Sequence, residues 1–170
     1  ALQDATCLNV SYLAASVDLS TYGVNYADLQ MLAELFSYAT TLGSLIQVPT
    51  LIAERLPAMN RLVEQASHDL LAAGNLQLLM KLIRQTEMLT REYDAVVANP
   101  PYMGGGGMNA TVKSYLRQRF TGYDKDLYSA FVVRLTALAK PNGSVGLMTS
   151  FVWMFLISHE ALRKLILSNH

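Results

Sequence analysis

The stretch YDAVVANPPYMGGGGMN, residues 93–109, decides the fold. It opens on the short apolar run DAVVA, which is typical of a buried strand, and this run stops at Asn99 and two prolines. Proline lacks a backbone N–H and does not continue a strand inside a sheet. The sequence therefore predicts a strand over residues 93–98, followed by a flexible loop at Gly104, Gly105, Gly106 and Gly107.

A second strand is predicted at residues 144–149, within the run SVGLMTS. Two helical patterns precede it, one at about 110–119 and an amphipathic one, KDLYSAFVVRLTALAK, at 125–140. Pro141-Asn142-Gly143 is expected to stop the second of these helices. A strand, a crossover helix and a second strand make a parallel pair with a right-handed connection, which places the chain in the α/β class. A last helix is predicted after Ser158, its N-cap.

A helical hairpin is predicted upstream of the first strand. Thr50 is a suitable N-cap for a helix whose apolar positions run on to Leu71. Gly74-Asn75 separates this helix from another at about 76–92. The two helices together form an αα-hairpin.

The domain organisation follows from this change of pattern. Residues 26–39 carry leucines at helical spacing, whereas residues 1–25 fit a strand or a helix equally well. We therefore expect a mainly helical segment at 1–92 and an α/β segment at 93–170.

The composition points to a part of a larger protein. Lysine plus arginine and aspartate plus glutamate number 13 each, so there is no basic excess of the kind that grips nucleic acid. Charged residues make up only 15%, against about 25% in ordinary domains. The most apolar run, residues 145–157, is broken by Thr149 and Ser150 and is shorter than the roughly 20 residues of a membrane span. We expect no membrane partner, and neighbouring portions of a parent chain that cover the apolar surface.

Cysteine and histidine usage indicates a protein without a metal or a disulfide. Cys7 is the sole cysteine, and the N-terminal residues do not resemble a signal peptide, which together favour the cytoplasm. His68, His159 and His170 are scattered, without the spacing of a metal site.

The residue types at 99–102 suit one kind of substrate group. Ligands of open α/β sheets bind beyond the carboxyl ends of strands. There Asn99 offers a side-chain carbonyl, and the peptides before Pro100 and Pro101 offer carbonyls without neighbouring N–H donors. Such acceptors suit a planar amino group, whose nitrogen is pushed toward tetrahedral geometry and becomes nucleophilic. Tyr102 supplies a flat face for an aromatic ring. The alternative is a plain proline-rich turn with a core tyrosine.

At these residues the chain resembles a known family. NPPY is the catalytic motif of class I amino-methyltransferases that use S-adenosyl-L-methionine. Together with DLYSAFVVRLTALAKPNGSVGLMTSFVWMF and the upstream LGSLIQVP, it resembles the adenine-specific DNA methyltransferases of BREX phage-defence systems and, more broadly, fused restriction-modification methyltransferases. The resemblance covers about residues 40–168. It implies a Rossmann-like methyltransferase fold, of which this chain supplies two neighbouring strands.

The resemblance implies methylation of the N6 amino group of adenine in double-stranded DNA, with the adenine flipped out of the duplex. Asn99 and the Pro100 carbonyl would accept from that amino group, Pro101 would keep the turn rigid, and Tyr102 would stack on the base. Phe131 matches the aromatic residue near the cofactor's adenine, although it also fits the apolar stripe of its own helix. Glycines 104–107 would form a loop that orders when DNA arrives.

The chain departs from the family in one respect. The family's cofactor site begins with a glycine-rich turn after its first strand, and no G-x-G turn precedes Asn99. The isolated chain is therefore expected neither to bind S-adenosyl-L-methionine nor to be active, and to associate as a homo-oligomer through its uncovered sheet. Two other readings stay open: a methyltransferase acting on RNA guanine or on a glutamine amide, and a non-catalytic interaction module.

Overall fold

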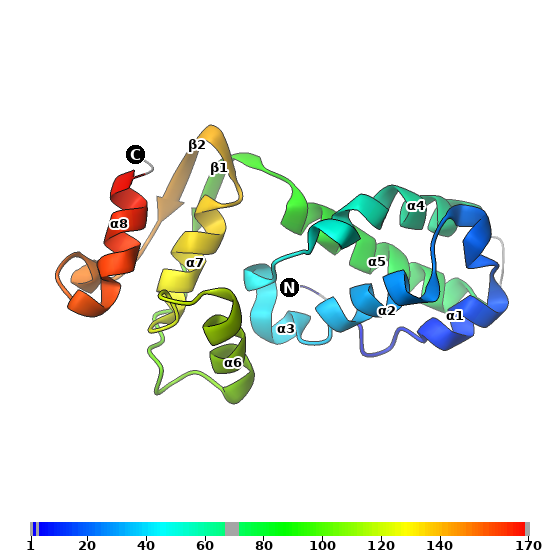
Figure 1. Ribbon diagram of the computed structural model, residues 1–170, viewed down its shortest axis with the longest axis horizontal. Coiled ribbons are helices and arrows are strands. Elements are labelled where there is room, and N and C mark those ends of the chain that lie inside the picture. Colours follow the sequence, from blue (N-terminus) through cyan, green and yellow to red (C-terminus); the bar gives the residue numbers. More distant parts are fainter. Residues whose placement is uncertain (1, 3, 67–71, 169–170) are drawn as a thin grey trace. The chain divides into compact units, whose positions relative to one another are not determined.

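The computed structural model describes residue 2 and residues 4–66 and 72–168. The chain divides into two compact units, Ala1–Arg91 and Glu92–His170, and each is described here by itself (Figure 1).

Helices are the only regular secondary structure among the described residues of the first unit. Its elements are α1 (Val10–Ser16), the 3-10 helix η1 (Leu19–Tyr22), α2 (Tyr26–Leu35), α3 (Ala39–Leu42), the 3-10 helix η2 (Gly43–Leu45), α4 (Thr50–Ala66) and α5 (Ala73–Thr90). Of the ambiguous N-terminal residues, 10–16 and 19–22 thus form helices, and none of the described ones forms a strand. An Asn25–Asp28 capping box starts α2, in which both side chains accept from the other residue's backbone N–H.

Helices α4 and α5 pack against each other and form the predicted hairpin (Figure 1). Helix α4 begins at Thr50, which is thus its first residue rather than the predicted N-cap, and continues through the exposed Pro57. The apolar residues at helical spacing on both helices are buried: Ile52, Met59, Leu62, Leu79, Leu82 and Ile83. The predicted helical positions Leu70 and Leu71 lie outside the described residues.

The second unit contains a two-stranded parallel sheet, which confirms the predicted α/β class. Its elements are β1 (Tyr93–Ala98), α6 (Ala110–Arg119), α7 (Leu127–Thr136), β2 (Ala139–Leu147), the 3-10 helices η3 (Phe151–Met154) and η4 (Ile157–His159), and α8 (Glu160–Ser168). Both strands run in the same direction, with Val96 opposite Val145 and Ala98 opposite Leu147.

Strand β2 begins earlier than the sequence indicates, at Ala139 rather than at residue 144, and ends at Leu147. The preceding helix α7 correspondingly ends at Thr136, so Pro141-Asn142-Gly143 lies inside the strand and does not stop the helix. The register jumps there, from Tyr93 opposite Ala139 to Ala95 opposite Ser144. Asn142 has a φ of 66°, and a Cβ at Gly143 would lie 3.0 Å from two backbone oxygens. The three residues therefore form an irregularity in the strand, in which a side chain at position 143 would crowd the backbone.

Helices α7 and α8 cover one face of this sheet. Val96 of β1 packs against Leu135 and Leu138, while Tyr128 and Val132 pack against Leu162 of α8. The opposite face carries Ala95, Val97, Gly146 and Met148, all exposed, with Val97 82% accessible. Among the described residues, no helix has both the length and the hydropathy needed to cross a membrane.

Candidate active site

The Asn-Pro-Pro-Tyr segment leaves the sheet at the carboxyl end of β1. The Ala98 carbonyl accepts from the Met148 N–H at 3.1 Å, which is the last bond between the two strands. Asn99 follows and is exposed, whereas Pro100 is buried. The strand therefore ends where the sequence predicts, and it presents Asn99 at the sheet edge where α/β proteins bind ligands.

Two oxygen acceptors lie in this segment, on Asn99 and Pro100. In the part of the chain that the structure describes, neither the Asn99 side-chain amide nor the Pro100 carbonyl takes part in a hydrogen bond. Pro100 and Pro101 contribute no N–H groups that would compete for these acceptors. The exposed Asn99 amide can thus bond to a ligand without giving up a hydrogen bond within the described residues.

Tyr102 follows these residues in the chain and is 54% exposed. Its edge-to-face partner is Tyr128, with ring centroids 6.3 Å apart and planes inclined at 65°. This geometry is favourable for an aromatic pair and leaves Tyr102 accessible to another ring.

The segment is tied by its backbone to the start of α7. The Leu127 N–H donates to the Met103 carbonyl at 3.0 Å, and Gly104 pairs with Asp126 in an isolated antiparallel bridge. Asp126 is also the N-cap of α7, accepting from the Tyr128 N–H. The first turn of α7 therefore fixes the position of Tyr102 through both its ring and its neighbouring backbone.

The four glycines form an exposed loop between two anchored ends. The Gly107 N–H donates to the Gly104 carbonyl at 2.9 Å and closes a turn. Met108, which follows, is buried, and Asn109 caps α6 by accepting from the Val112 N–H at 2.8 Å. The role of this loop in holding substrate stays a prediction.

The buried His159 contacts Tyr128, and the sequence alone did not predict this contact. The Tyr128 hydroxyl is 3.2 Å from His159 Nε2, and the Ser129 hydroxyl is 3.2 Å from His159 Nδ1. These residues are about 30 positions apart in the chain, so no spacing pattern reveals the contact. Burial lowers the pKa of His159 below 6.5; Asp126 opposes this effect and Arg163 adds to it. Burial likewise raises the pKa of Tyr128.

The lowered pKa of His159 predicts a loss of stability in mild acid. Below the ordinary value of 6.5 the unfolded chain takes up a proton that the folded chain resists. The contribution of His159 to the free energy of unfolding is therefore complete above pH 6.5. It is lost as the pH falls from 6.5 through the lower pKa that His159 has in the folded chain. Urea unfolding of the chain at about pH 7.5 and about pH 5.5 should show the decline. His159→Gln, which does not titrate, should show less of it; equal declines would contradict the assignment.

Phe131 lies in the core of the sheet. Its half-buried ring packs against the cluster of Val96, Leu135 and Leu138, beneath the strands. The contacts of Phe131 are therefore those of a residue in the apolar stripe of its helix, which is the alternative that the sequence left open. A role for Phe131 beside a cofactor stays a prediction.

The described residues contain no group of three or more histidine, cysteine, aspartate or glutamate side chains placed to hold a metal ion. His159 is engaged with Tyr128 and Ser129, while His68 and His170 lie outside the described residues.

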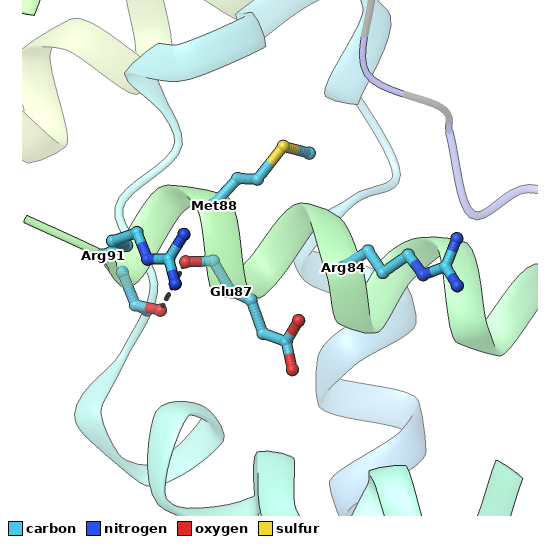
Figure 2. A pocket seen from close by; sticks show the side chains of 5 residues that line it. Arg84, Glu87, Met88 and Arg91 are labelled. Atoms are coloured by element: carbon cyan, nitrogen blue, oxygen red, sulfur yellow. Dashed lines mark hydrogen bonds between the residues drawn. The ribbon is translucent and has the colours of Figure 1, made fainter. Parts of the chain in front are cut away.

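A hollow of about 740 Å³ lies in the first unit along the last turns of α5 (Figure 2). Asn60 holds Glu87 through a 2.8 Å hydrogen bond, and Thr90 donates to the Glu87 carbonyl. The Arg84 side chain extends away from Glu87 along the helix, and the side chains of Met88 and Glu87 point to opposite sides of it (Figure 2). These side chains do not converge on one point, so the hollow does not have the arrangement of a reactive centre.

Comparison with known proteins shows the family of the chain. The model of the Eco57I restriction-modification methylase family matches residues 15–170. The chain is 39% identical over 156 residues to the adenine-specific methyltransferase BrxX of Escherichia coli O9:H4 (strain HS), a match that covers 88% of this chain and 13% of BrxX.

Two further relatives match smaller stretches. The adenine-specific methyltransferase PglX of Lacticaseibacillus casei (strain Zhang) is 40% identical over 86 residues, covering 51% of this chain and 7% of PglX. The type II methyltransferase M.BanIII of Aneurinibacillus aneurinilyticus is 32% identical over 78 residues, covering 45% of this chain and 13% of that protein. The chain thus corresponds to a small part of the length of these relatives. The resemblance seen in the sequence is confirmed, and the chain belongs to the Eco57I restriction-modification methylase family.

Proposed function

We propose that the full-length protein methylates the N6 amino group of adenine in double-stranded DNA, in phage defence or restriction-modification. The names of BrxX and PglX, both adenine-specific methyltransferases, support this substrate. The observation that carries the proposal is the pair of acceptors at the end of β1, the Asn99 amide and the Pro100 carbonyl, followed in the chain by an exposed aromatic ring.

The chemistry follows from these acceptors. An adenine amino group that donates one hydrogen to Asn99 and the other to Pro100 loses conjugation with its ring, and its nitrogen lone pair becomes available. Acceptors held rigid before the substrate arrives favour the transition state without reorganising, and the two prolines supply that rigidity. The carbonyls of Asn99 and Pro100 would therefore orient and activate the nucleophile.

We propose S-adenosyl-L-methionine as the methyl donor, which when bound supplies an electrophilic methyl group. This chain fits that cofactor only in part. Phe131 is the one aromatic residue assigned to it, and that ring packs into the core beneath the strands. The glycines before Asn99, at positions 23, 43 and 74, lie apart and form no G-x-G turn. We therefore assign Asn99, Pro100 and Tyr102 to binding of the substrate adenine and its amino group, and none of them to binding of the cofactor.

The decisive experiment is to express the full-length protein in bacteria that lack adenine methylation and to measure methylated nucleosides by mass spectrometry. N6-methyladenine in DNA is the expected product. Methylation of RNA guanine or of a protein glutamine, with unmodified DNA, would replace the proposal with one of its alternatives. If no methylated nucleoside or amino acid were found, the remaining interpretation would be a non-catalytic interaction module.

Tyr102→Ala should weaken productive binding of the flipped adenine, because a base stacked on an aromatic side chain gains about 1–3 kcal/mol. We expect the rate of methylation at limiting DNA to fall by about 5- to 150-fold. Tyr102→Phe keeps the ring and should retain most of the activity, since the Tyr102 hydroxyl has no hydrogen-bond partner among the described residues. Equal losses in the two variants would mean that the ring does not act by stacking.

A further inference from the structure

The exposed Tyr102 ring contacts the buried Tyr128 ring, and Tyr128 in turn contacts the buried His159. We propose that His159 is a positioning residue, which holds Tyr128 and through it sets the orientation of Tyr102 for stacking on the substrate base. This inference rests on the proposed function, because it assigns a role to residues that support the proposed base-stacking ring.

The first step is the contact between the two tyrosines. Tyr128 is 1% exposed and Tyr102 is more than half exposed, so one ring belongs to the core and the other to the surface. They meet edge to face at 6.3 Å. A shift or rotation of the Tyr128 ring therefore moves the support on which Tyr102 rests.

The second step is the double contact made by His159. Its two ring nitrogens face the hydroxyls of Tyr128 and Ser129, neighbours on the first turn of α7. A neutral imidazole has one donor and one acceptor, and each hydroxyl can take the complementary part. The two rings also lie 5.6 Å apart with planes inclined at 30°. The contact with Nε2 therefore holds the Tyr128 hydroxyl as well as its ring, whereas the contact with Nδ1 goes to Ser129 and does not reach Tyr128.

The third step is the support of His159 itself. The His159 N–H donates to the Leu156 carbonyl at 3.1 Å, and Arg163 Nη1 donates to the carbonyls of Leu156 and Trp153 at 2.6 and 2.7 Å. One arginine of α8 thus holds the turn that carries the histidine. The imidazole is 6% exposed and contacts Tyr128, so it acts through Tyr128 and does not touch the substrate.

The two ring nitrogens allow a test that separates positioning from general stability. The amide of His159→Gln reaches about as far as Nε2 and retains the contact with Tyr128. The shorter amide of His159→Asn reaches about as far as Nδ1 and retains only the contact with Ser129. Tyr128→Phe removes the same contact from the other side and keeps the buried ring.

The expected result is a loss of kcat of about 10- to 100-fold for His159→Asn and Tyr128→Phe, because small displacements in a site cost this much. His159→Gln should retain kcat, and so should Ser129→Ala. These measurements use the full-length protein and unmethylated phage genomic DNA as the substrate. In a Tyr102→Ala background, Tyr128→Phe should have no additional effect, since the ring that it positions is gone.

A second readout does not depend on activity. The fluorine NMR signal of a fluorotyrosine placed at position 102 of the full-length protein should shift or broaden with Tyr128→Phe and stay unchanged with Ser129→Ala. An unchanged signal and unchanged kcat in Tyr128→Phe would overturn the positioning role. An altered signal in a protein that deposits no methyl mark would support the positioning role while refuting the proposed function, so the two failures are distinct.

Discussion

Replacing Asn99 by alanine in the full-length protein is expected to lower the rate of adenine methylation by about 10²- to 10³-fold. Asn99 stands at the end of β1 with a side-chain amide that makes no hydrogen bond within the described residues. Its removal leaves one of the two amino hydrogens of adenine without an acceptor at the moment when the nitrogen must become nucleophilic. Removing one such preorganised group typically costs about 2.7–4 kcal/mol of transition-state stabilisation.

The same substitution should leave folding intact, because Asn99 is exposed and its side chain makes no hydrogen bond within the described residues. Asn60→Ala, which removes an amide of the same size from α4, is the matched control and should methylate DNA normally. The measurement is N6-methyladenine formed per enzyme with time, together with the melting temperature of each variant. A methylation rate in Asn99→Ala equal to that of Asn60→Ala would refute the assignment of Asn99.

Replacing Phe120 by alanine is expected to cost about 3–5 kcal/mol of the free energy of unfolding of the second unit. Phe120 is 2% exposed and lies where α6 ends, against the ring of Tyr115 at 6.2 Å. Its backbone also fixes the turn, since its N–H donates to the Leu116 carbonyl and its carbonyl accepts from the Tyr123 N–H, both at 2.8 Å. Truncating this ring removes apolar contacts and leaves a cavity that the turn has little freedom to fill.

Phe155→Ala makes the same chemical change at a side chain that is 74% exposed, so it should alter the free energy of unfolding by no more than about 0.5 kcal/mol. Urea unfolding followed by the fluorescence of Trp153, the sole tryptophan of the chain, compares the two variants within the same unit. Similar midpoints for both would mean that Phe120 is not part of the core.

The parts of the fold that are predictable from sequence have local causes. Strand β1 ends at Ala98 because Asn99-Pro100-Pro101 cannot continue it, and helix α6 starts after Asn109 because that side chain caps it. Residues 99–102 likewise form one continuous stretch, so the groups that carry the proposed chemistry are already adjacent in the chain. Neighbouring residues in the sequence were sufficient to predict the end of β1, the start of α6 and the grouping of residues 99–102.

The parts that escaped prediction depend on contacts between distant residues. Tyr93 donates to the Leu138 carbonyl and pairs with Ala139, which extends β2 backward through Pro141-Asn142-Gly143, a sequence that otherwise indicates a turn. His159 reaches Tyr128 across about 30 positions, and a lone histidine gives no sign of such a partner. Tertiary contacts override local preference in both places.

The parallel pairing of β1 with β2 also has a consequence for synthesis on the ribosome. Ala95 and its partner Ser144 are separated by about 50 residues, so at about 5–20 residues per second β1 emerges roughly 2–10 s before β2. During that interval the nascent chain carries a finished apolar strand without its hydrogen-bonding neighbour. Strand edges of this kind attract other chains, and chaperones that bind short apolar segments would be expected to engage DAVVA until residues 139–147 have been translated.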